Sequence, residues 1–561
     1  MSSIKPQSHQ FAKRVRTWAG RLRFNGWSLA VLLIACLVAL PILVVLGSIF
    51  APAGAIWQHL SSTVLTTYIT NSLGLLLGVS AGVLTLGIGT AWLVTVCRFP
   101  GRRVFEWALL LPLAAPAYLL AYTYTDFLEY FGPVQTLLRS LFGWQSATDY
   151  WFPNVRSIGG AIAMLSLTLY PYVYMLSRVA FLEQSTVTLE ASRSLGCGPW
   201  RSFFTVALPL ARPAITTGLS LALMETLNDF GTVQYFGVGT FTTGIYRTWF
   251  GMGERVAAAQ LAAMLMLFIL GLILLERWSR RQARYYQSGS QQQASAYYLR
   301  DWRSPLAFFA CLIPIALGLL LPGGLLLNMT IRHADETLDN SFVGLAYHSI
   351  LLAVMTAGVA VLVSLLLAYG ARLQRSLLIG FGVQIASMGY AVPGSVIAVG
   401  ILIPVTQLDR AIAGWIGALT GTSPGLIFSG TVAALVFAYL VRFLAVSLGS
   451  VESGLAKIRP SLDNAARSLG YTPAETLREV HAPLLWSSLM TAVMLVFVDV
   501  MKELPATIVM RPFNFDTLAV RVYQYAADER LIEAAAPALM ILLVGLLPVV
   551  LLSWQIARTR R

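Results

Sequence analysis

Long apolar runs alternate with short polar segments along almost the whole chain. Most runs approach or exceed the roughly 18 to 20 residues that an α-helix needs to cross the hydrocarbon layer of a bilayer. They predict membrane-spanning helices at about residues 27–50, 70–97, 106–128, 157–182, 213–237, 257–276, 305–327, 348–370, 377–404, 425–451, 485–510 and 531–555. The expected fold class is all-α polytopic, with about 12 transmembrane helices.

Composition agrees with this pattern, because 57% of the residues are hydrophobic and only 11% are charged. The first run, 27–50, is too long for the hydrophobic region of a signal peptide and ends without a small-x-small cleavage site. We therefore expect it to be a retained span. The four cysteines are too scattered for a disulfide framework or a zinc site.

The net charge of +14 fits a membrane topology. Arg and Lys mark cytoplasmic loops, and here they gather in a basic tail 1–26, a Gln/Ser-rich linker 277–303 and a short tail 557–561, whereas 51–69 has none. We expect a multi-pass protein of the lipid bilayer with both termini in the cytoplasm and an exposed, flexible cytoplasmic linker. The charge then needs no nucleic-acid partner.

Two polar loops repeat each other in register. Glycine and two prolines recur 274 residues apart, as the pairs Gly196 and Gly470, Pro199 and Pro473, and Pro209 and Pro483. Pro116 and Pro393 recur at 277, so the repeat reaches into the spans. Equal order and orientation predict two parallel homologous halves. They are the permease halves 27–276 and 304–556, with loops at about 183–212 and 452–484.

Loop and topology together resemble the permeases of ATP-binding-cassette importers, whose cytoplasmic EAA loop reads roughly E-A-A-x-x-x-G with a later Leu-Pro. The matching residues are Glu190, Ala191, Ser192, Gly196 and Pro209 in the first loop, and Asn464, Ala465, Ala466, Gly470 and Pro483 in the second. The second loop departs from the pattern at Asn464, where the family has Glu, and at Ala482, where it has Leu.

The resemblance implies that each loop docks a cytoplasmic ATPase subunit, so that two copies bind, and that a periplasmic binding protein delivers the substrate. Physically, a glycine with positive φ allows a sharp helix exit, and the following proline prevents the helix from continuing. The alternative is an ordinary amphipathic helix at the membrane surface. The in-register second copy favours docking.

The sequence contains no recognisable ATP-hydrolysing site. A phosphate-binding loop of the type G-x-x-x-x-G-K-[ST] needs a lysine after glycine, and none of Lys5, Lys13, Lys457 and Lys502 follows one. The five histidines are isolated, which argues against metal-dependent hydrolysis. We expect no enzyme activity and no cofactor bound by this chain, with ATP and Mg on the partner ATPase.

Acidic residues inside two predicted spans are the candidates for a substrate path. Glu225 and Asp229 recur as Asp499 and Glu503, and Lys502 stands where the first half has Asn228. Intramembrane charges are costly and should face a polar interior. The two residues of each acidic pair are four apart, on one helical face, and the repeat then brings four carboxylates around one axis. Tyr118, Tyr122 and Asp126 add oxygen donors from the third span.

Two interpretations of these carboxylates stay open. In one they are structural, with Lys502 pairing one of them and the others bonding to neighbouring helices. In the other, Glu225, Asp229, Asp499 and Glu503 line a path for a cation and hold it transiently, since carboxylates and phenols suit hard ions.

Longer stretches, including ETLNDFGTVQYFG and MKELPATIVMRPFNFDTLAVRVYQ, resemble the fused permeases of bacterial ferric-iron importers. This resemblance implies an inner-membrane permease that moves Fe(III) as substrate. Thiamine and aminoethylphosphonate permeases share the fused architecture and are alternatives. A secondary transporter of the major-facilitator type also has twelve spans in two parallel halves, but has no counterpart of the two loops.

Overall fold

The computed structural model describes residues 26–559 except 53, 185–191, 193, 282–296, 339, 375, 422–424 and 426. Apart from one pair of two-residue strands, the regular structure of these residues is helical. Its elements are α2 (Gly26–Gly47), η1 (Ser48–Phe50), α3 (Ala55–Thr63), α4 (Leu65–Val96), β1 (Cys97–Arg98), α5 (Arg102–Ala108), η2 (Leu111–Ala114), α6 (Ala117–Leu128), α7 (Pro133–Phe142), α8 (Ile158–Glu183), α10 (Pro199–Ser202), η3 (Phe203–Ala207), α11 (Leu208–Asn228), α12 (Gly231–Tyr235), α13 (Phe241–Tyr246), η4 (Arg247–Gly251), α14 (Arg255–Arg281), β2 (Tyr297–Tyr298), α15 (Arg303–Ile315), η5 (Ala316–Leu320), α16 (Leu321–Arg332), α17 (Ala334–Thr337), α18 (Asn340–Leu373), α19 (Leu377–Ala386), η6 (Ser387–Ala391), α20 (Gly394–Thr420), α21 (Val432–Ala456), α22 (Pro460–Ser468), α23 (Pro473–Glu475), η7 (Thr476–His481), α24 (Ala482–Leu484), α25 (Trp486–Met501), α26 (Pro505–Met510), α27 (Leu518–Ala527) and α28 (Leu531–Thr559).

The number of spans agrees with the sequence pattern. Within the described residues, ten helices are long and apolar enough to cross a membrane, and the number rises to twelve if each of two bent helix pairs is one span. The bent pairs are Arg102–Ala114 with Ala117–Phe142 and Pro473–Leu484 with Trp486–Met501, which turn by 88° and 79°. The predicted all-α polytopic fold is confirmed.

Several predicted span limits were wrong, because prolines and caps divide apolar runs. The predicted span 213–237 ends as α11 at Asn228, and the predicted span 485–510 ends as α25 at Met501; a short helix follows each. The predicted span 377–404 is divided at Pro393, after which α20 runs on to Thr420. The residue before a proline favours extended backbone, which ends a helix there.

Three prolines begin or enter a helix directly after a π-helical segment. The segments η3, η5 and η7 each end two residues before a proline, namely Pro209, Pro322 and Pro483, and the helix continues through each proline. Proline lacks an N–H and its ring collides with the carbonyl four residues earlier. A π segment widens the turn at that point. Pro209 and Pro483 of the two repeated loops are therefore accommodated within α11 and α24.

The chain forms two compact units that do not follow the two sequence halves. The first unit contains 26–43, 354–390 and 439–497, and the second contains 44–353, 391–438 and 498–559 within the described residues. The first helix of each half packs on helices of the other half, and segments 391–438 and 498–559 of the second half also belong to the second unit. The domain limits 27–276 and 304–556 stay predictions about the repeat.

In the first unit, α2 packs against the C-terminal part of α18. The rings of Trp27 and Tyr369 meet edge to face with centroids 5.4 Å apart. Gly370 allows the close approach, since a Cβ there would lie 2.8 Å from a methyl carbon of Val31. The Ser28 hydroxyl donates to the side-chain oxygen of Gln374.

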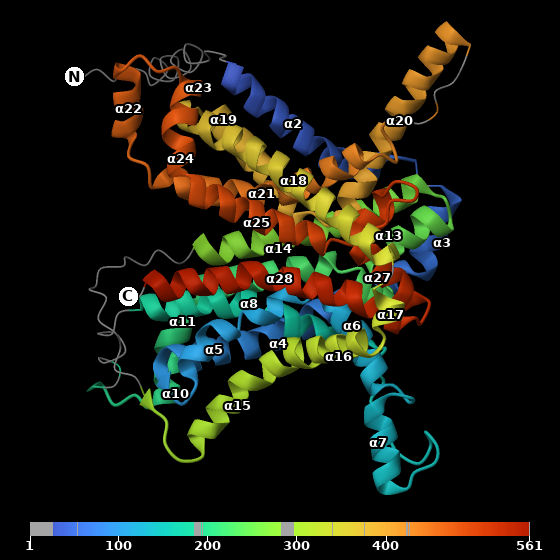
Figure 1. Cartoon of the computed structure of the whole chain (residues 1–561), viewed down its shortest axis with the longest axis vertical. Coiled ribbons are helices and arrows are strands. Elements are labelled where there is room, and N and C mark those ends of the chain that lie inside the picture. The colour runs from blue at the N-terminus through green and yellow to red at the C-terminus, as the bar shows by residue number, and fades with distance from the viewer. Residues whose placement is uncertain are drawn as a thin grey trace, which may run out of the picture. The chain divides into compact units, whose positions relative to one another are not determined.

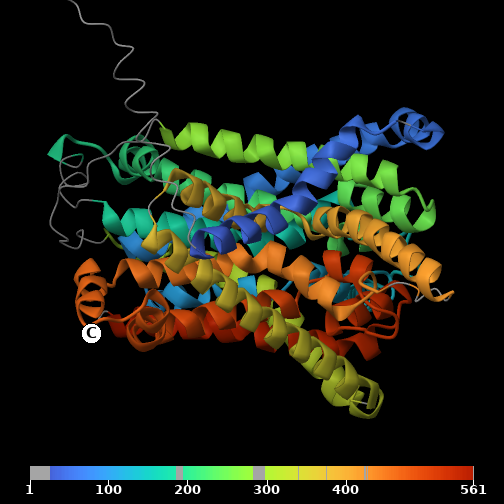
Figure 2. The same cartoon turned by 90° about the horizontal axis from the view of Figure 1, so that it is seen from above.

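In the second unit, α8 packs between α4 and α11, as Figure 1 shows. Close approach depends on Gly87 of α4 and Gly218 of α11, where a Cβ would lie 2.8–2.9 Å from atoms of Val173. The helix α14 is the long light-green helix seen along its full length in Figure 2. The α15–α16 region packs on first-half helices, and the Tyr124 hydroxyl donates to the carbonyl of Leu317 at 2.7 Å.

The linker and tails are partly outside the described residues. The predicted linker begins inside α14, which continues to Arg281, and residues 282–296 lie outside the described part. At its far end β2 pairs in parallel with β1, through Cys97 with Tyr297 and Arg98 with Tyr298. Of the tails, 1–25 and 560–561 lie outside, and α28 includes 557–559.

Candidate functional site

The two repeated loops share one backbone feature at their glycines. Gly196 has φ +83° and Gly470 has φ +85°, a conformation that L-residues with a Cβ rarely adopt. A Cβ on either residue would meet no atom within 4 Å. The requirement for glycine is therefore conformational, and the predicted sharp turn is confirmed in both loops.

Each glycine is preceded by a leucine that stands in solvent. Leu195 is 85% exposed and Leu469 is 76% exposed, and they stand at matching positions of the repeat. Large exposed apolar side chains at a polar loop are typical of an interaction surface. Sequence reasoning missed both leucines, although their position directly before the turning glycine was a usable signal.

The other predicted docking residues divide by burial. Ser192 and Ala466 occupy matching positions and are buried, and the Ser192 hydroxyl lies 2.7 Å from that of Ser202. Asn464 and Ala465 are exposed on α22. Glu190 and Ala191 lie outside the described residues.

The prolines of the two loops begin the next helix, in addition to ending the previous one. Pro473 is at the first position of α23, and Thr472 before it forms a reciprocal capping box with Glu475. Pro199 likewise begins α10. This position suits proline, because the first N–H of a helix has no partner inside the helix.

The candidate path residues lie where both membrane helices break. Asp229 lies beyond α11 with an extended ψ of 132°, and Glu503 lies beyond α25. Asp229 accepts hydrogen bonds from the Val233 N–H at 3.0 Å and the Thr232 hydroxyl at 2.8 Å. The predicted shared helical face of Glu225 and Asp229 was therefore wrong, because the helix ends between them.

Glu503 repeats this arrangement in the second half. It accepts from the Ala506 N–H at 2.8 Å and the Thr507 N–H at 3.0 Å, and it is buried. Asp229 and Glu503 thus cap the short helices α12 and α26, whose first N–H groups lack partners in the helix. The shared face expected for Asp499 and Glu503 was wrong for the same reason.

The other two carboxylates have different partners. The Lys502 ammonium lies 2.9 Å from Asp499, as one sequence interpretation expected. At the matching place in the first half, the Asn228 amide lies 3.4 Å from a Glu225 oxygen. The charge of Asp499 is therefore balanced by a cation, whereas the amide beside Glu225 is neutral. With Glu225 and Asp499 counted as −1 each and Lys502 as +1, the side chains of Glu225, Asn228, Asp499 and Lys502 carry a net charge near −1.

Contacts between the halves surround the same breaks. The Asn228 side-chain oxygen accepts from the Gly394 N–H at 2.9 Å, at the start of α20. On the other side, the Tyr118 hydroxyl lies 3.5 Å from the Lys502 carbonyl oxygen. Pro116 and Pro393 thus precede two helices, α6 and α20, whose first turns contact the other half of the repeat. The contact of α6 lies at the end of α25, and the contact of α20 lies at the end of α11.

The tyrosines of α6 pack beside this region. The rings of Tyr118 and Tyr122 have centroids 5.7 Å apart, and Tyr122 meets Tyr235 edge to face at 4.6 Å. Both α6 tyrosines are buried, and the Tyr122 hydroxyl has no hydrogen-bond partner among the described residues. Tyr122 and Asp126 line the same small cavity, as expected for residues four apart on a helix.

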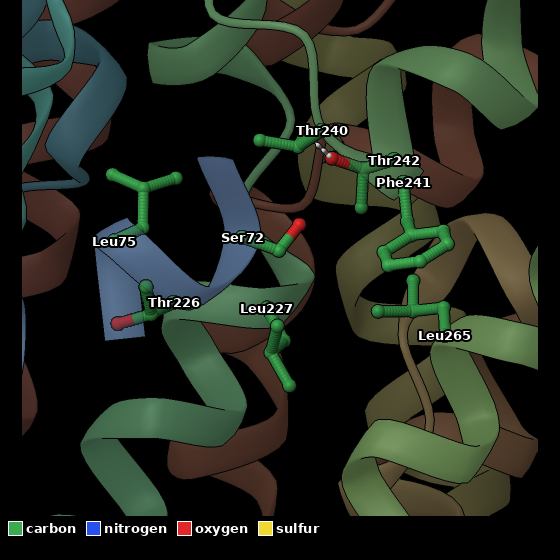
Figure 3. A pocket seen from close by; sticks show the side chains of 8 residues that line it. All are labelled: Ser72, Leu75, Thr226, Leu227, Thr240, Phe241, Thr242 and Leu265. Atoms are coloured by element: carbon green, nitrogen blue, oxygen red, sulfur yellow. Dashed lines mark hydrogen bonds between the residues drawn. The ribbon is translucent and has the colours of Figure 1, made fainter. Parts of the chain in front are cut away.

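A second small cavity lies beside the break after α11. Figure 3 shows its lining, with Ser72, Thr226, Thr240 and Thr242 supplying hydroxyls among apolar side chains. Its volume is about 10 Å³, which is about enough for one water molecule. A hydrated or chelated metal ion is too large for it in this conformation.

The described residues contain no group of three or more His, Cys, Asp or Glu side chains that could hold a metal ion. The four carboxylates are therefore not gathered into a ready-made ligand cage in this conformation. Two are committed to helix caps and one to an ion pair.

Comparison with known proteins gives a consistent result. The family model described as "Binding-protein-dependent transport system inner membrane component" matches residues 83–285. The chain is 24% identical over 494 residues to the Fe(3+)-transport system permease protein FbpB 2 of Haemophilus influenzae, covering 86% of this chain and 89% of that protein. It is 23% identical over 543 residues to the ferric transport system permease protein FbpB of Actinobacillus pleuropneumoniae, covering 92% and 74%.

A shorter relative matches with higher identity. The molybdenum transport system permease protein ModB of Escherichia coli is 30% identical over 208 residues, which are 36% of this chain and 87% of that protein.

Proposed function

Because this chain belongs to the family of inner membrane components of binding-protein-dependent transport systems, we propose that its substrate is Fe(III), carried inward across the inner membrane. The chain is a multi-pass permease and not an enzyme. The relatives that are similar over most of its length are named for ferric iron transport, which supports iron over the other substrates of the family.

Two matched loops carry the docking part of the proposal. Each loop presents an exposed leucine, Leu195 or Leu469, on a turn whose glycine has positive φ. A rigid turn transmits movement better than a flexible loop, since packed elements shift as bodies. We propose that each loop receives one copy of a cytoplasmic ATPase, which binds ATP and Mg, and that a periplasmic binding protein delivers the iron.

The carboxylates near the helix breaks support a cation as substrate. Glu225 lies 3.4 Å from the Asn228 amide and within electrostatic range of Lys502, whose ammonium lies 2.9 Å from Asp499. A hard cation such as Fe(III) prefers oxygen ligands. We propose that Glu225, Asp229, Asp499 and Glu503 line the path, and that any coordination forms during the transport cycle, after the caps open.

The proposal places both termini in the cytoplasm, on the side of the two docking loops. The positive-inside rule supports this orientation, because the basic loops and tails lie on one side of the predicted topology.

Radiolabelled Fe(III) uptake tests the function directly. Proteoliposomes would hold the full chain with its ATPase, with iron-loaded binding protein outside and ATP inside. We expect ATP-dependent accumulation of iron. Hydrolysis stimulated by thiamine-loaded or molybdate-loaded protein, without iron uptake, would discard iron and keep the importer. Uptake driven by a proton gradient without ATP would contradict the importer itself.

A double variant tests the docking role within the same assay. Replacing Leu195→Ser and Leu469→Ser should release the ATPase during co-purification and abolish uptake. The matched control is Leu141→Ser, which changes a leucine of similar exposure, 69%, on α7 outside the loops. Retention of the ATPase by the double variant, with normal uptake, would contradict docking through these residues.

A further inference from the structure

An ion-paired cluster fixes the second docking loop to two membrane helices. Asp463 on α22 accepts two hydrogen bonds from the Arg372 guanidinium, at 2.9 Å from Nε and 2.7 Å from Nη2. Its other oxygen lies 2.6 Å from Nε2 of His481, at the end of η7. The two guanidinium N–H groups share the oxygen Oδ2, and such charge-assisted hydrogen bonds are shorter and roughly twice as strong as neutral ones. Both helical segments of the loop are thereby held by one carboxylate.

Arg372 also fixes the end of a second membrane helix. It belongs to the last turn of α18, and its Nη1 and Nη2 donate to the carbonyls of Leu455 and Ile458 at 2.7 and 2.9 Å. These carbonyls lie at the C-terminus of α21, where a cation is favoured by the helix dipole and the last C=O groups lack partners. One guanidinium therefore joins α22 to the last turn of α18 and to the C-terminal end of α21, and these three segments belong to the first unit.

His481 completes the cluster from the interior. Its side chain is fully buried, and its ring centroid is 5.3 Å from that of Tyr369 on α18. Since a carboxylate oxygen can only accept, Nε2 carries the proton that is shared with Asp463. The imidazole thus presses the second segment of the loop against the same helix that holds Arg372.

The electrostatics favour a persistently charged Asp463. Its partial burial opposes ionisation, but the hydrogen bonds from Arg372 and His481 outweigh burial and hold the pKa of Asp463 below its usual value. The first loop has Leu189 at the matching position, so an equivalent carboxylate is absent from the sequence there.

We propose that Asp463, with Arg372 and His481, is the positioning cluster that couples ATPase movement at the second loop to α18 and α21. The inference rests on the proposed docking function. In the second half, Asp463 connects the loop rigidly to the membrane helices. The first loop has Leu189 at the matching position and cannot make the same connection through that residue. None of the three side chains needs to touch the ATPase, ATP or the substrate.

The test compares hydrolysis with transport in the full complex. Asp463→Ala removes three charge-assisted hydrogen bonds. It should keep the ATPase bound and hydrolysing, while the number of ATP molecules used per iron transported rises at least about tenfold, the factor that corresponds to one such bond. Asp463→Glu, which keeps the charge, should restore much of the coupling. The matched control is Glu533→Gln, which breaks a bidentate pair with Arg530 of 2.8 and 2.9 Å outside the loop.

Other outcomes would overturn the inference. An unchanged ratio of hydrolysis to transport in Asp463→Ala means that the cluster does not couple. Loss of the ATPase from this variant means that the cluster only shapes the docking surface. If Asp463→Ala fails to fold, His481→Phe removes the donor to the same carboxylate, keeps a ring against Tyr369 and is read by the same ratio. A wild-type complex that shows no ATPase binding contradicts the proposed function instead.

Discussion

At the scale of single residues, the loops depend on backbone conformation more than on side-chain contacts. Gly196 and Gly470 adopt nearly the same positive φ, and neither is crowded. The flanking residues differ between the copies, since Glu190 is replaced by Asn464. What the repeat keeps is the turn, the exposed leucine before it and the two prolines after it.

We predict that Gly196→Ala and Gly470→Ala strain the loops without preventing membrane insertion. An alanine at positive φ costs about 1–3 kcal/mol, so the turn should open and uptake should fall while the protein stays in the membrane. The control is Gly449→Ala in the interior of α21, where a Cβ meets no atom within 4 Å. Normal uptake in both loop variants would refute the importance of the turn.

At the scale of elements, the notable feature is a pair of broken membrane helices. Both α11 and α25 end near a charged residue, and a short helix capped by Asp229 or Glu503 follows. Two of the four intramembrane carboxylates therefore have a structural task. This task and a role in transport are compatible, because a cap can open when the helix moves.

Substitution of Asp229 separates the two roles. Asp229→Ala removes the acceptor for the Val233 N–H and should destabilise the protein by about 1 kcal/mol, whereas Asp229→Asn keeps an acceptor and should cost less. Thermal unfolding of the purified chain measures this difference. If Asp229→Asn is as stable as wild type but transports poorly, the charge matters for the path. Equal loss of stability in both variants would contradict the capping role.

At the scale of the whole molecule, the two halves exchange their first helices. The helix α2 packs on α18 of the second half, and the α15–α16 region packs on α6 of the first half. The repeat is also visible in matched contacts. Asn71 donates to the Gly239 carbonyl at 2.9 Å, and His348 lies 3.3 Å from the Asp516 carbonyl, again 277 residues on.

The path also has to be tested across both halves, since each supplies one of the carboxylates that are not caps. We predict that Glu225→Gln combined with Asp499→Asn lowers iron uptake without releasing the ATPase. The reason is that the summed charge of residues 225, 228, 499 and 502 changes from −1 to +1, which disfavours a cation. Uptake and co-purification are measured together. Wild-type uptake in the double variant would exclude these two residues from the path, and Glu533→Gln serves as the control for loss of a carboxylate.

The sequence by itself determined the class of the protein, the approximate spans and the two loops. These depend on local quantities, namely the length of apolar runs, the position of Gly196 and Gly470, and an offset that stays at 274 or 277. Membrane insertion requires long apolar segments whatever their neighbours are, and a positive φ is set by the residue that adopts it. Both are therefore readable without a structure.

Tertiary structure alone decided how the charges are used. Nothing local distinguishes Asp229, which caps a helix, from Glu225, which does not. At the break between them, the Asn228 side chain accepts from the Gly394 N–H, and a Cβ on Gly231 would lie 2.7 Å from the Cβ of Tyr118. The cluster at Asp463 joins residues 91 and 18 positions away in sequence. Such contacts form only when distant helices pack, because a carboxylate takes its partner from whatever donor the fold places beside it.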